Sequence, residues 1–207
     1  MLLKRLIGIL TSAAMLLAGF TAAAPASAES AIALTDIFNT SAVTKVILDV
    51  PAASEASLNN QKTLKTWVSA SVRFEQGSKT SQNFKIGMRL KGSTSIQPLK
   101  QKPSIKIKFN WSELAGQRFL GLKNLTLNAM TQDGSKIHEF GAYKLFNAMN
   151  IPAPRTGWAT VKVNGVDRGL YVNIETYDDI FLATRFTDTS LHLYEGQAFN
   201  DLKPGNA

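Results

Sequence analysis

The residues of this sequence best able to do chemistry are eight basic side chains between Glu75 and Glu113, a stretch with no acidic residue. They are Lys79, Lys85, Arg89, Lys91, Lys100, Lys102, Lys106 and Lys108. Because side chains alternate along a strand, Arg89 and Lys91 share one strand face, and Lys106 and Lys108 share another. If these two strands pair, the four cations line one surface. The pattern favours a polyanionic ligand, although a solvated outer sheet face rich in lysine has the same spacing.

A loop that carries hydroxyl groups, Gly92-Ser93-Thr94-Ser95, follows the first of these strands. Such a loop can turn backbone N–H groups toward an anion. No phosphate-loop, dinucleotide-binding, nucleophile-elbow or zinc-protease motif accompanies it. His138 and His192 are far apart in sequence, so we expect surface or hydrogen-bonded histidines rather than metal ligands. Asp178 and Asp179 stand at an expected helix start, where carboxylates favour the helix dipole.

The composition is that of a globular chain with a positive charge. Of its 207 residues, 44% are hydrophobic and 18% are charged, and the formal net charge is +8. These values exclude a disordered tail and a collagen-like fibre. The lack of cysteine excludes disulfides, thiolate metal sites and a cysteine nucleophile. The charge favours an anionic partner, but we do not expect nucleic acid, because the cations come without surface aromatics for base stacking.

The first 28 residues have the pattern of a secretory signal peptide. Lys4 and Arg5 precede an apolar run over residues 6–20, and Ala26-Ser27-Ala28 forms an A-x-A site. The run is short for a membrane span of about 20 residues. We expect cleavage after Ala28, export from a bacterial cell, and no membrane span in the mature chain. The expected organisation is a signal peptide over 1–28, a flexible leader over 29–42 and one domain over 43–207.

Alternating apolar and polar residues predict strands, over residues 43–50, 67–74, 84–91 and 104–109. Asn164-Gly165, the preferred pair for a tight hairpin, lies between alternating segments at 159–163 and 170–174.

One main helix is expected from Ser135 to Met149, capped by Asp133 or Ser135. Its apolar stripe toward the core comprises Ile137, Phe140, Gly141, Leu145 and Ala148. The expected fold class is α+β, with an antiparallel sheet packed against this helix.

Several segments, in this order, resemble the CotH family of secreted, atypical protein kinases, which includes the spore-coat protein of that name. The matching segments are MRLKGSTS at 88–95, KPSIKIKF at 102–109, FLGLKNLTLNA at 119–129, QDGS at 132–135, YKLF at 143–146, IPAPR at 151–155, VNG at 163–165 and GLYVNIE at 169–175. The resemblance extends over about residues 43–196.

This resemblance implies the amino-terminal lobe and hinge of a kinase-like fold, with the carboxy-terminal lobe missing. The segment from Arg89 to Ser95 would cover the phosphates of ATP. A lysine, either Lys102, Lys106 or Lys108, would contact those phosphates. Glu139 would pair with that lysine, unless it is an exposed helix carboxylate, and Glu175 would lie near the hinge beside the adenine. The implied nucleotide-binding residues are Arg89, Lys91, Gly92, Ser93, Ser95, Lys102, Lys106, Lys108, Glu139 and Glu175.

The implied reaction is ATP-dependent phosphorylation of Ser or Thr in exported or coat proteins, with Mg²⁺ or Mn²⁺. The family's catalytic and metal-binding acids belong to N-x-D and D-x-D motifs, and this sequence contains neither. We therefore assign no catalytic or metal-binding residue and expect a truncated domain with weak or absent activity alone. Two alternatives stay open: a non-catalytic secreted module that binds a nucleotide or acidic polymer, and a structural surface or coat component.

Overall fold

The computed structural model describes residues 30–60, 63–92, 95–190 and 193. The expected signal peptide, its cleavage site after Ala28, and Ser93 of the expected phosphate loop lie outside the described residues. Among the described residues, no helix is both long enough and apolar enough to cross a bilayer.

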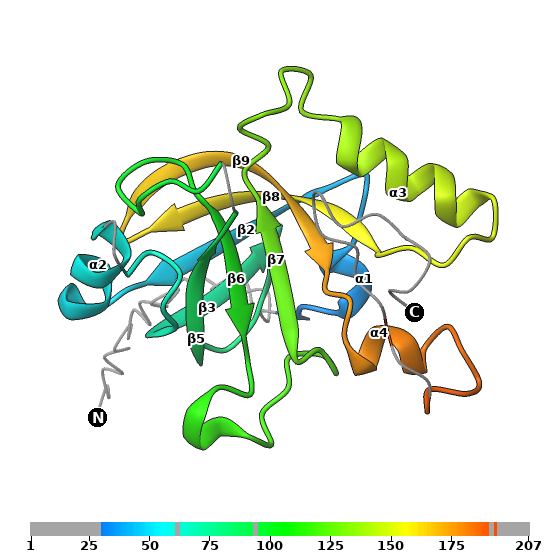
Figure 1. The fold of residues 1–207 in the computed structure, drawn as a ribbon, viewed down its shortest axis with the longest axis horizontal. Helices are drawn as coiled ribbons and strands as arrows, with labels where there is room; N and C mark the ends of the chain where they lie inside the picture. The colour runs from blue at the N-terminus through cyan, green and yellow to red at the C-terminus, as the bar shows by residue number, and fades with distance from the viewer. Residues whose placement is uncertain (1–29, 61–62, 93–94, 191–192, 194–207) are drawn as a thin grey trace, which may run out of the picture.

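Strands dominate the described chain (Figure 1). They are β1 (Ser30–Ala31), β2 (Val43–Asp49), β3 (Val68–Gln76), β4 (Lys79–Thr80), β5 (Phe84–Lys91), β6 (Ser104–Lys108), β7 (Asn124–Asn128), β8 (Thr156–Val163) and β9 (Val166–Glu175). The α-helices are α1 (Leu34–Ile37), α2 (Ala52–Asn59), α3 (His138–Ala148) and α4 (Asp179–Ala183), and a 3-10 turn, η1, covers Ser112–Leu114.

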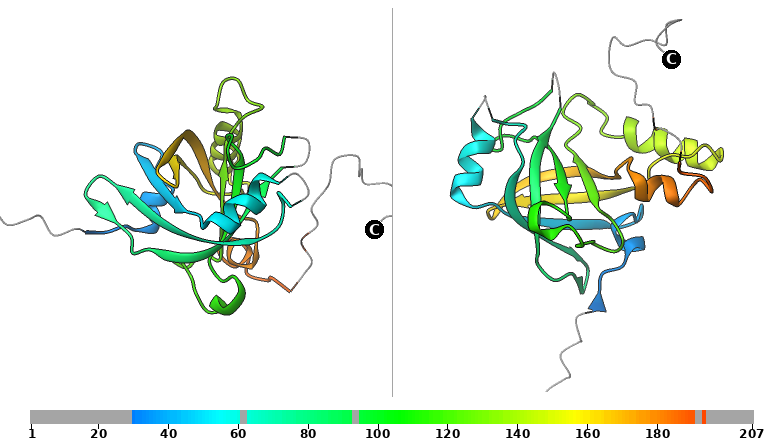
Figure 2. Two further views of the ribbon diagram at one scale, coloured as in Figure 1. Left: turned by 90° about the vertical axis from the view of Figure 1, so that its left-hand side faces the viewer. Right: turned by 60° about the horizontal axis from the view of Figure 1, so that its bottom comes forward.

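Seven of the strands form a closed barrel, in the order β3-β2-β8-β9-β7-β6-β5, with β5 pairing back to β3. Most neighbours are antiparallel, but β2 and β8 are parallel, with Val46 opposite Val161. Figure 2 shows these strands wrapping around a common interior. The prediction of an α+β kinase-like lobe with an antiparallel sheet on a main helix is therefore wrong. The sheet buries its apolar face against itself, so no helix is needed to cover it.

The barrel interior is the hydrophobic core. Alternation along each strand turns one side chain in two inward, and Leu48, Met88, Ile107, Leu127 and Val161 are fully buried. An aromatic cluster fills one part of the interior, where the rings of Phe74 and Phe119 stack with centroids 4.4 Å apart.

Helix α3 lies on the outside of the barrel. It begins at His138, later than predicted, because Asp133 holds a preceding turn: its carboxylate accepts from the N–H groups of Ser135 and His138 at 2.9 Å each. No residue of α3 is buried. The predicted core stripe is wrong at Ile137 and Leu145, which are 53% and 58% exposed, and at Ala148, which is also exposed. Its packing centres on Phe140, whose ring stacks on Trp158 with centroids 4.4 Å apart.

Two local expectations have different outcomes. The hairpin at Asn164-Gly165 is confirmed: both residues have positive φ angles, 48° and 80°, and the turn joins β8 to β9. The predicted flexible leader instead carries β1 and α1, and Ile37 of α1 is fully buried. A Cβ on Gly157 of β8 would lie 2.5 Å from the Ile37 carbonyl oxygen, so glycine permits this close approach of α1.

Candidate functional site

The outer faces of β5, β6 and β7 carry the cations that the sequence singles out. The register places Arg89 of β5 opposite Lys106 of β6, which lies opposite Thr126 of β7. Lys91 lies opposite Ser104 one step along. Because Ile105 and Ile107, on either side of Lys106, are fully buried, the basic side chains of β6 point away from the core. The two strands pair as expected, and their basic residues share the outer surface.

A cleft runs between this surface and α3. It consists of two adjoining hollows of about 290 and 170 Å³, both of which include Lys91 and Glu139 in their walls. We call it the α3 cleft. Its other lining residues are Ser95, Ser104, Lys106, Thr126, Asn128, Met130, Thr131, Gln132, Asp133, His138, Tyr143, Ile174, Glu175, Thr176 and Tyr177. The cleft thus gathers two ammonium groups, three carboxylates (Asp133, Glu139 and Glu175) and several hydroxyl groups beside α3.

The other two predicted cations lie outside this cleft. The guanidinium carbon of Arg89 lies over the Trp67 ring, 5.2 Å from its centroid, and Lys108 Nζ lies 5.9 Å from the same centroid. The register explains this, since Val68 lies opposite Met88 and Trp67 therefore stands opposite Arg89. Such contacts hold a cation at an aromatic face. The outer surface is thereby divided between the α3 cleft and a basic patch formed by Trp67, Arg89 and Lys108.

Glu139 stands in the first turn of α3 and faces the cleft. Its carboxylate accepts a hydrogen bond from the Asn128 side-chain amide at the end of β7. Burial raises the pKa of the Tyr143 phenol well above its ordinary 10.0, and the negative charge of Glu139 adds to that rise. Tyr143 therefore stays neutral, and Glu139 supplies the negative charge at this wall of the cleft.

Lys102 is separated from the other predicted lysines. It lies in the connection from β5 to β6, with Nζ 5.3 Å from the centroid of the buried Tyr171 ring. Burial and the nearby charge of Lys136 lower the pKa of Lys102. Of the predicted loop, Ser95 lines the cleft, whereas Gly92 permits the turn: its φ is +134°, and a Cβ there would lie 3.0 Å from the Ile96 nitrogen.

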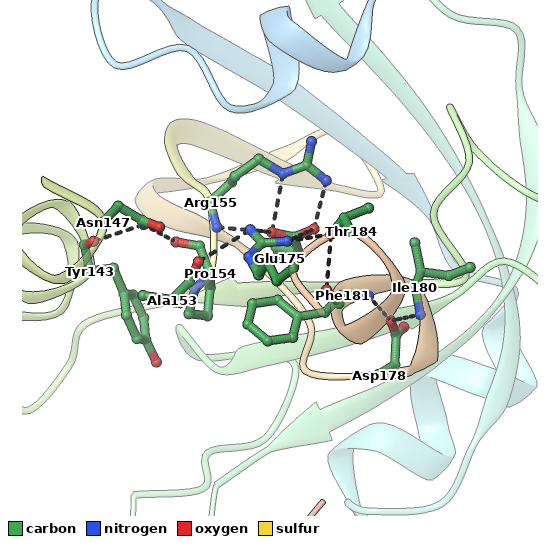
Figure 3. Close-up of polar contacts among 11 residues, drawn as sticks. Tyr143, Asn147, Ala153, Pro154, Arg155, Glu175, Asp178, Ile180, Phe181 and Thr184 are labelled. Carbon is green, nitrogen blue, oxygen red and sulfur yellow. Dashed lines mark hydrogen bonds and ion pairs between the residues drawn. The ribbon is translucent and has the colours of Figure 1, made fainter. Parts of the chain in front are cut away.

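Glu175 ends β9 and has a strongly bound carboxylate (Figure 3). Arg155 donates to it from its backbone N–H at 3.0 Å, from Nε at 3.1 Å and from Nη2 at 2.6 Å. Arg185 donates from Nη2 at 2.5 Å. Burial alone would raise the pKa of Glu175, but the hydrogen bonds and charges of the two arginines outweigh it and lower the pKa below 4.5. The side chain predicted to lie beside adenine thus joins β9 to the start of β8 and to the residues after α4.

Sequence reasoning missed several residues that shape this region. Trp67 precedes β3, and it comes to lie opposite Arg89 only through the pairing register of β3 with β5. Arg155 and Arg185 meet at Glu175 from positions far apart in sequence. Asn128 could have been predicted to face outward beside α3, because it lies two residues after Thr126 on the same face of β7.

Comparison with known proteins gives two likenesses. The model of a family described as CotH kinase protein matches residues 88–206, a range that includes every residue lining the α3 cleft. Inner spore coat protein H of Bacillus subtilis (strain 168) is 31% identical over 67 residues. That stretch covers 32% of this chain, and the chain spans only 18% of the length of that relative.

Proposed function

This chain belongs to the CotH kinase protein family, and we propose that its α3 cleft binds the phosphates of ATP. The observation that carries the proposal is the meeting of Lys91 and Lys106 at one cleft. Each ammonium group can contact a different phosphate oxygen, because the two residues come from neighbouring strands. Ser95 and Ser104 add hydroxyl groups at the same wall. The lining also carries three carboxylates. Glu139 opposes the lysines from α3, whereas Asp133 accepts hydrogen bonds from the N–H groups of Ser135 and His138. Glu175 is paired with Arg155 and Arg185.

The family reaction that we propose for the whole protein is phosphorylation of Ser or Thr in exported or coat proteins. The chain matches a protein named for the inner spore coat, which supports an association with that layer. Among the described residues, no three His, Asp or Glu side chains gather as a metal ion requires. The residues present do not fit a magnesium site, so we assign no step to a metal. We propose that this chain alone binds ATP and transfers its phosphate slowly or not at all.

Titration calorimetry with ATP, with and without Mg²⁺ or Mn²⁺, tests the binding step. Removal of one charge-assisted contact costs roughly 1.5–3 kcal/mol, so Lys106→Ala should weaken binding by about 10- to 100-fold. Lys100→Ala is the matched control, because Lys100 is exposed and lies outside the cleft lining. Absence of ATP heat in the wild type, or equal losses in both variants, would contradict the proposal.

Phosphoryl transfer needs a separate assay, so that binding and activity can fail independently. We would follow transfer from labelled ATP to a serine-rich acceptor with Mg²⁺ or Mn²⁺. Turnover no faster than a Lys106→Ala control is the expected result. Rapid turnover by the wild type that is lost in Lys106→Ala would refute the proposal of slow transfer. It would leave the proposal of ATP binding intact. Export is tested separately, by sequencing the amino terminus of the secreted product, which should begin at Glu29.

A second candidate function is supported by the basic patch of Trp67, Arg89 and Lys108. The described residues place no carboxylate in an ion pair with either cation. Such a surface would bind an acidic polymer beside the cleft. Arg89→Gln with Lys108→Gln should then lower retention on a polyphosphate matrix without changing the ATP titration. Unchanged retention would remove this candidate.

A further inference from the structure

A second cavity, of about 550 Å³, lies against a different face of α3 from the cleft. It is lined by Leu34, Thr35, Phe38, Thr40, Lys144, Asn147, Ala148, Arg155 and Thr156. None of these residues lines the α3 cleft. Helix α1, helix α3 and the start of β8 therefore border an open pocket separate from the proposed nucleotide site, and its volume is within the range of small-molecule sites.

The lining of this cavity combines apolar and polar side chains. Leu34 and Phe38 come from the region of α1, and Ala148 ends α3. The hydroxyl groups of Thr35, Thr40 and Thr156 provide hydrogen-bonding positions. The lining contains two cations and no acidic residue. A ligand that matches these walls has an apolar body and a negatively charged end.

Arg155 gives the cavity its fixed positive charge. Its guanidinium carbon lies 4.9 Å from the centroid of the Phe38 ring, so the charge stands beside an apolar part of the lining. Glu175 neutralises one positive charge there, but Arg185 binds the same carboxylate, so the three side chains together carry a net charge of +1. The Arg155 side chain is 35% exposed, whereas that of Glu175 is 2% exposed. The cation, not the carboxylate, is thus accessible from the cavity.

Lys144 adds a second positive charge from α3. No described carboxylate forms an ion pair with its ammonium group. Two positive charges beside an aromatic ring and an aliphatic wall favour an anion that also buries apolar surface. Inorganic phosphate would pair with the two cations but make no apolar contact. A neutral hydrocarbon would make the apolar contact but leave the cations without an anion.

We propose that this cavity binds a small amphipathic anion: a flat or aliphatic body against Leu34 and Phe38, with a carboxylate, sulfonate or phosphate end at Lys144 and Arg155. The proposal does not depend on the nucleotide function of the cleft, because the two sites share no lining residue.

The probe for this site is 8-anilinonaphthalene-1-sulfonate, whose fluorescence rises when its rings leave water. The expected result is one saturable site on the full chain, displaced by decanoate if the body is aliphatic and by naphthoate if it is aromatic. Inorganic phosphate at the same concentration should displace little. The neutral analogue N-phenyl-1-naphthylamine should bind about tenfold more weakly, because it lacks the charge.

Two variants locate the probe. Lys144→Gln should raise its Kd about fivefold, whereas Lys65→Gln, which changes an exposed lysine outside the lining, should leave the Kd unchanged. Thr35→Trp fills the cavity from the exposed side of α1 and should abolish the saturable signal while both cations remain. Lys106→Ala should not affect the probe, since it lies in the cleft. Fluorescence that neither Lys144→Gln nor Thr35→Trp changes would mean binding to exposed apolar surface elsewhere and would overturn the proposal.

Discussion

Replacement of Glu175 by glutamine tests whether its ion pairs hold the barrel end together. Glu175→Gln keeps the size of the side chain but removes the negative charge between Arg155 and Arg185. The carboxylate is only 2% exposed, whereas the arginine side chains are 35% and 14% exposed. After the change, two guanidinium groups face each other with no anion between them. The folded state therefore loses attraction and gains repulsion.

Breaking a buried ion pair on one side costs about 3–5 kcal/mol. Partial solvation of Arg155 reduces that cost, so we expect Glu175→Gln to lower the free energy of unfolding by about 2–4 kcal/mol. For a domain of this size, that loss corresponds to a fall in Tm of roughly 4–16 °C. Asp179→Asn is the matched control. It also removes a carboxylate that pairs with a cation, Lys123, but its side chain is 63% exposed, so we expect at most about 1 kcal/mol.

The pH dependence identifies the group responsible. The pKa of Glu175 is lower in the folded state than its ordinary 4.5, so the folded state favours the ionised form. Its stabilisation is present in full above the unfolded pKa and is lost as the pH falls through the folded pKa. The stability difference between wild type and Glu175→Gln should be constant from pH 8 to about pH 5.5 and shrink at lower pH.

Urea unfolding curves between pH 3 and pH 8 measure this difference. Other acids with lowered pKa values, such as Asp36, destabilise both proteins equally in acid and cancel in the comparison. Three results would refute the reasoning: a loss below 1 kcal/mol at pH 7, a loss equal to that of Asp179→Asn, or a difference that does not shrink in acid.

Three further predictions concern packing. Gly87→Ala would place a Cβ 2.3 Å from Cγ of Trp111, so the indole must move. We expect the free energy of unfolding to fall by about 1–3 kcal/mol and the tryptophan emission to change. The control is Gly116→Ala, which should keep the wild-type emission because nothing lies within 4 Å of the added Cβ. Leu145→Ser should change stability by less than about 0.5 kcal/mol, because this helix residue is 58% exposed. Leu127→Ala should cost about 2–5 kcal/mol in the same urea assay, because Leu127 is fully buried in the barrel.

The strands could be predicted from local alternation. The expected strand over residues 84–91 is β5 as observed, and the expected turn at Asn164-Gly165 joins β8 and β9. These features depend on side chains close together in sequence. The closure of the sheet does not: the parallel pairing of β2 with β8 and the return of β5 to β3 join segments whose own patterns show no preferred partner. The α+β expectation was wrong for this reason.

The strand β9 shows why alternation alone can mislead about faces. Leu170, Val172 and Ile174 follow the apolar alternation, which predicts that they face the core. Instead Tyr171, Asn173 and Glu175 turn inward, where Glu175 stands opposite Leu125. Val172 and Ile174 face outward and pack near α3. Both faces are buried at this point, so the apolar set is not the inner set.

Of the candidate site, the sequence could predict only which basic residues share one face of a strand. Sequence periodicity places Lys106 and Lys108 on the same face, but the neighbours across the sheet decide what each contacts. Lys106 lines the α3 cleft, and Lys108 lies over Trp67. Trp67 carries no signal of this role, because its position opposite Arg89 depends on the β3–β5 register.

Stability and site assembly are separable in this molecule because the barrel core does not include α3. The helix is held mainly by Phe140 on Trp158, by the hydrogen bond from Asn128 to Glu139, and by Asn147, which donates to the Pro154 carbonyl at 3.1 Å. Yet α3 forms walls of both the cleft and the second cavity. A change that loosens the helix would alter both sites while the interior of the barrel stays packed. The position of α3 is therefore the structural variable that links the proposed nucleotide site to the proposed anion site.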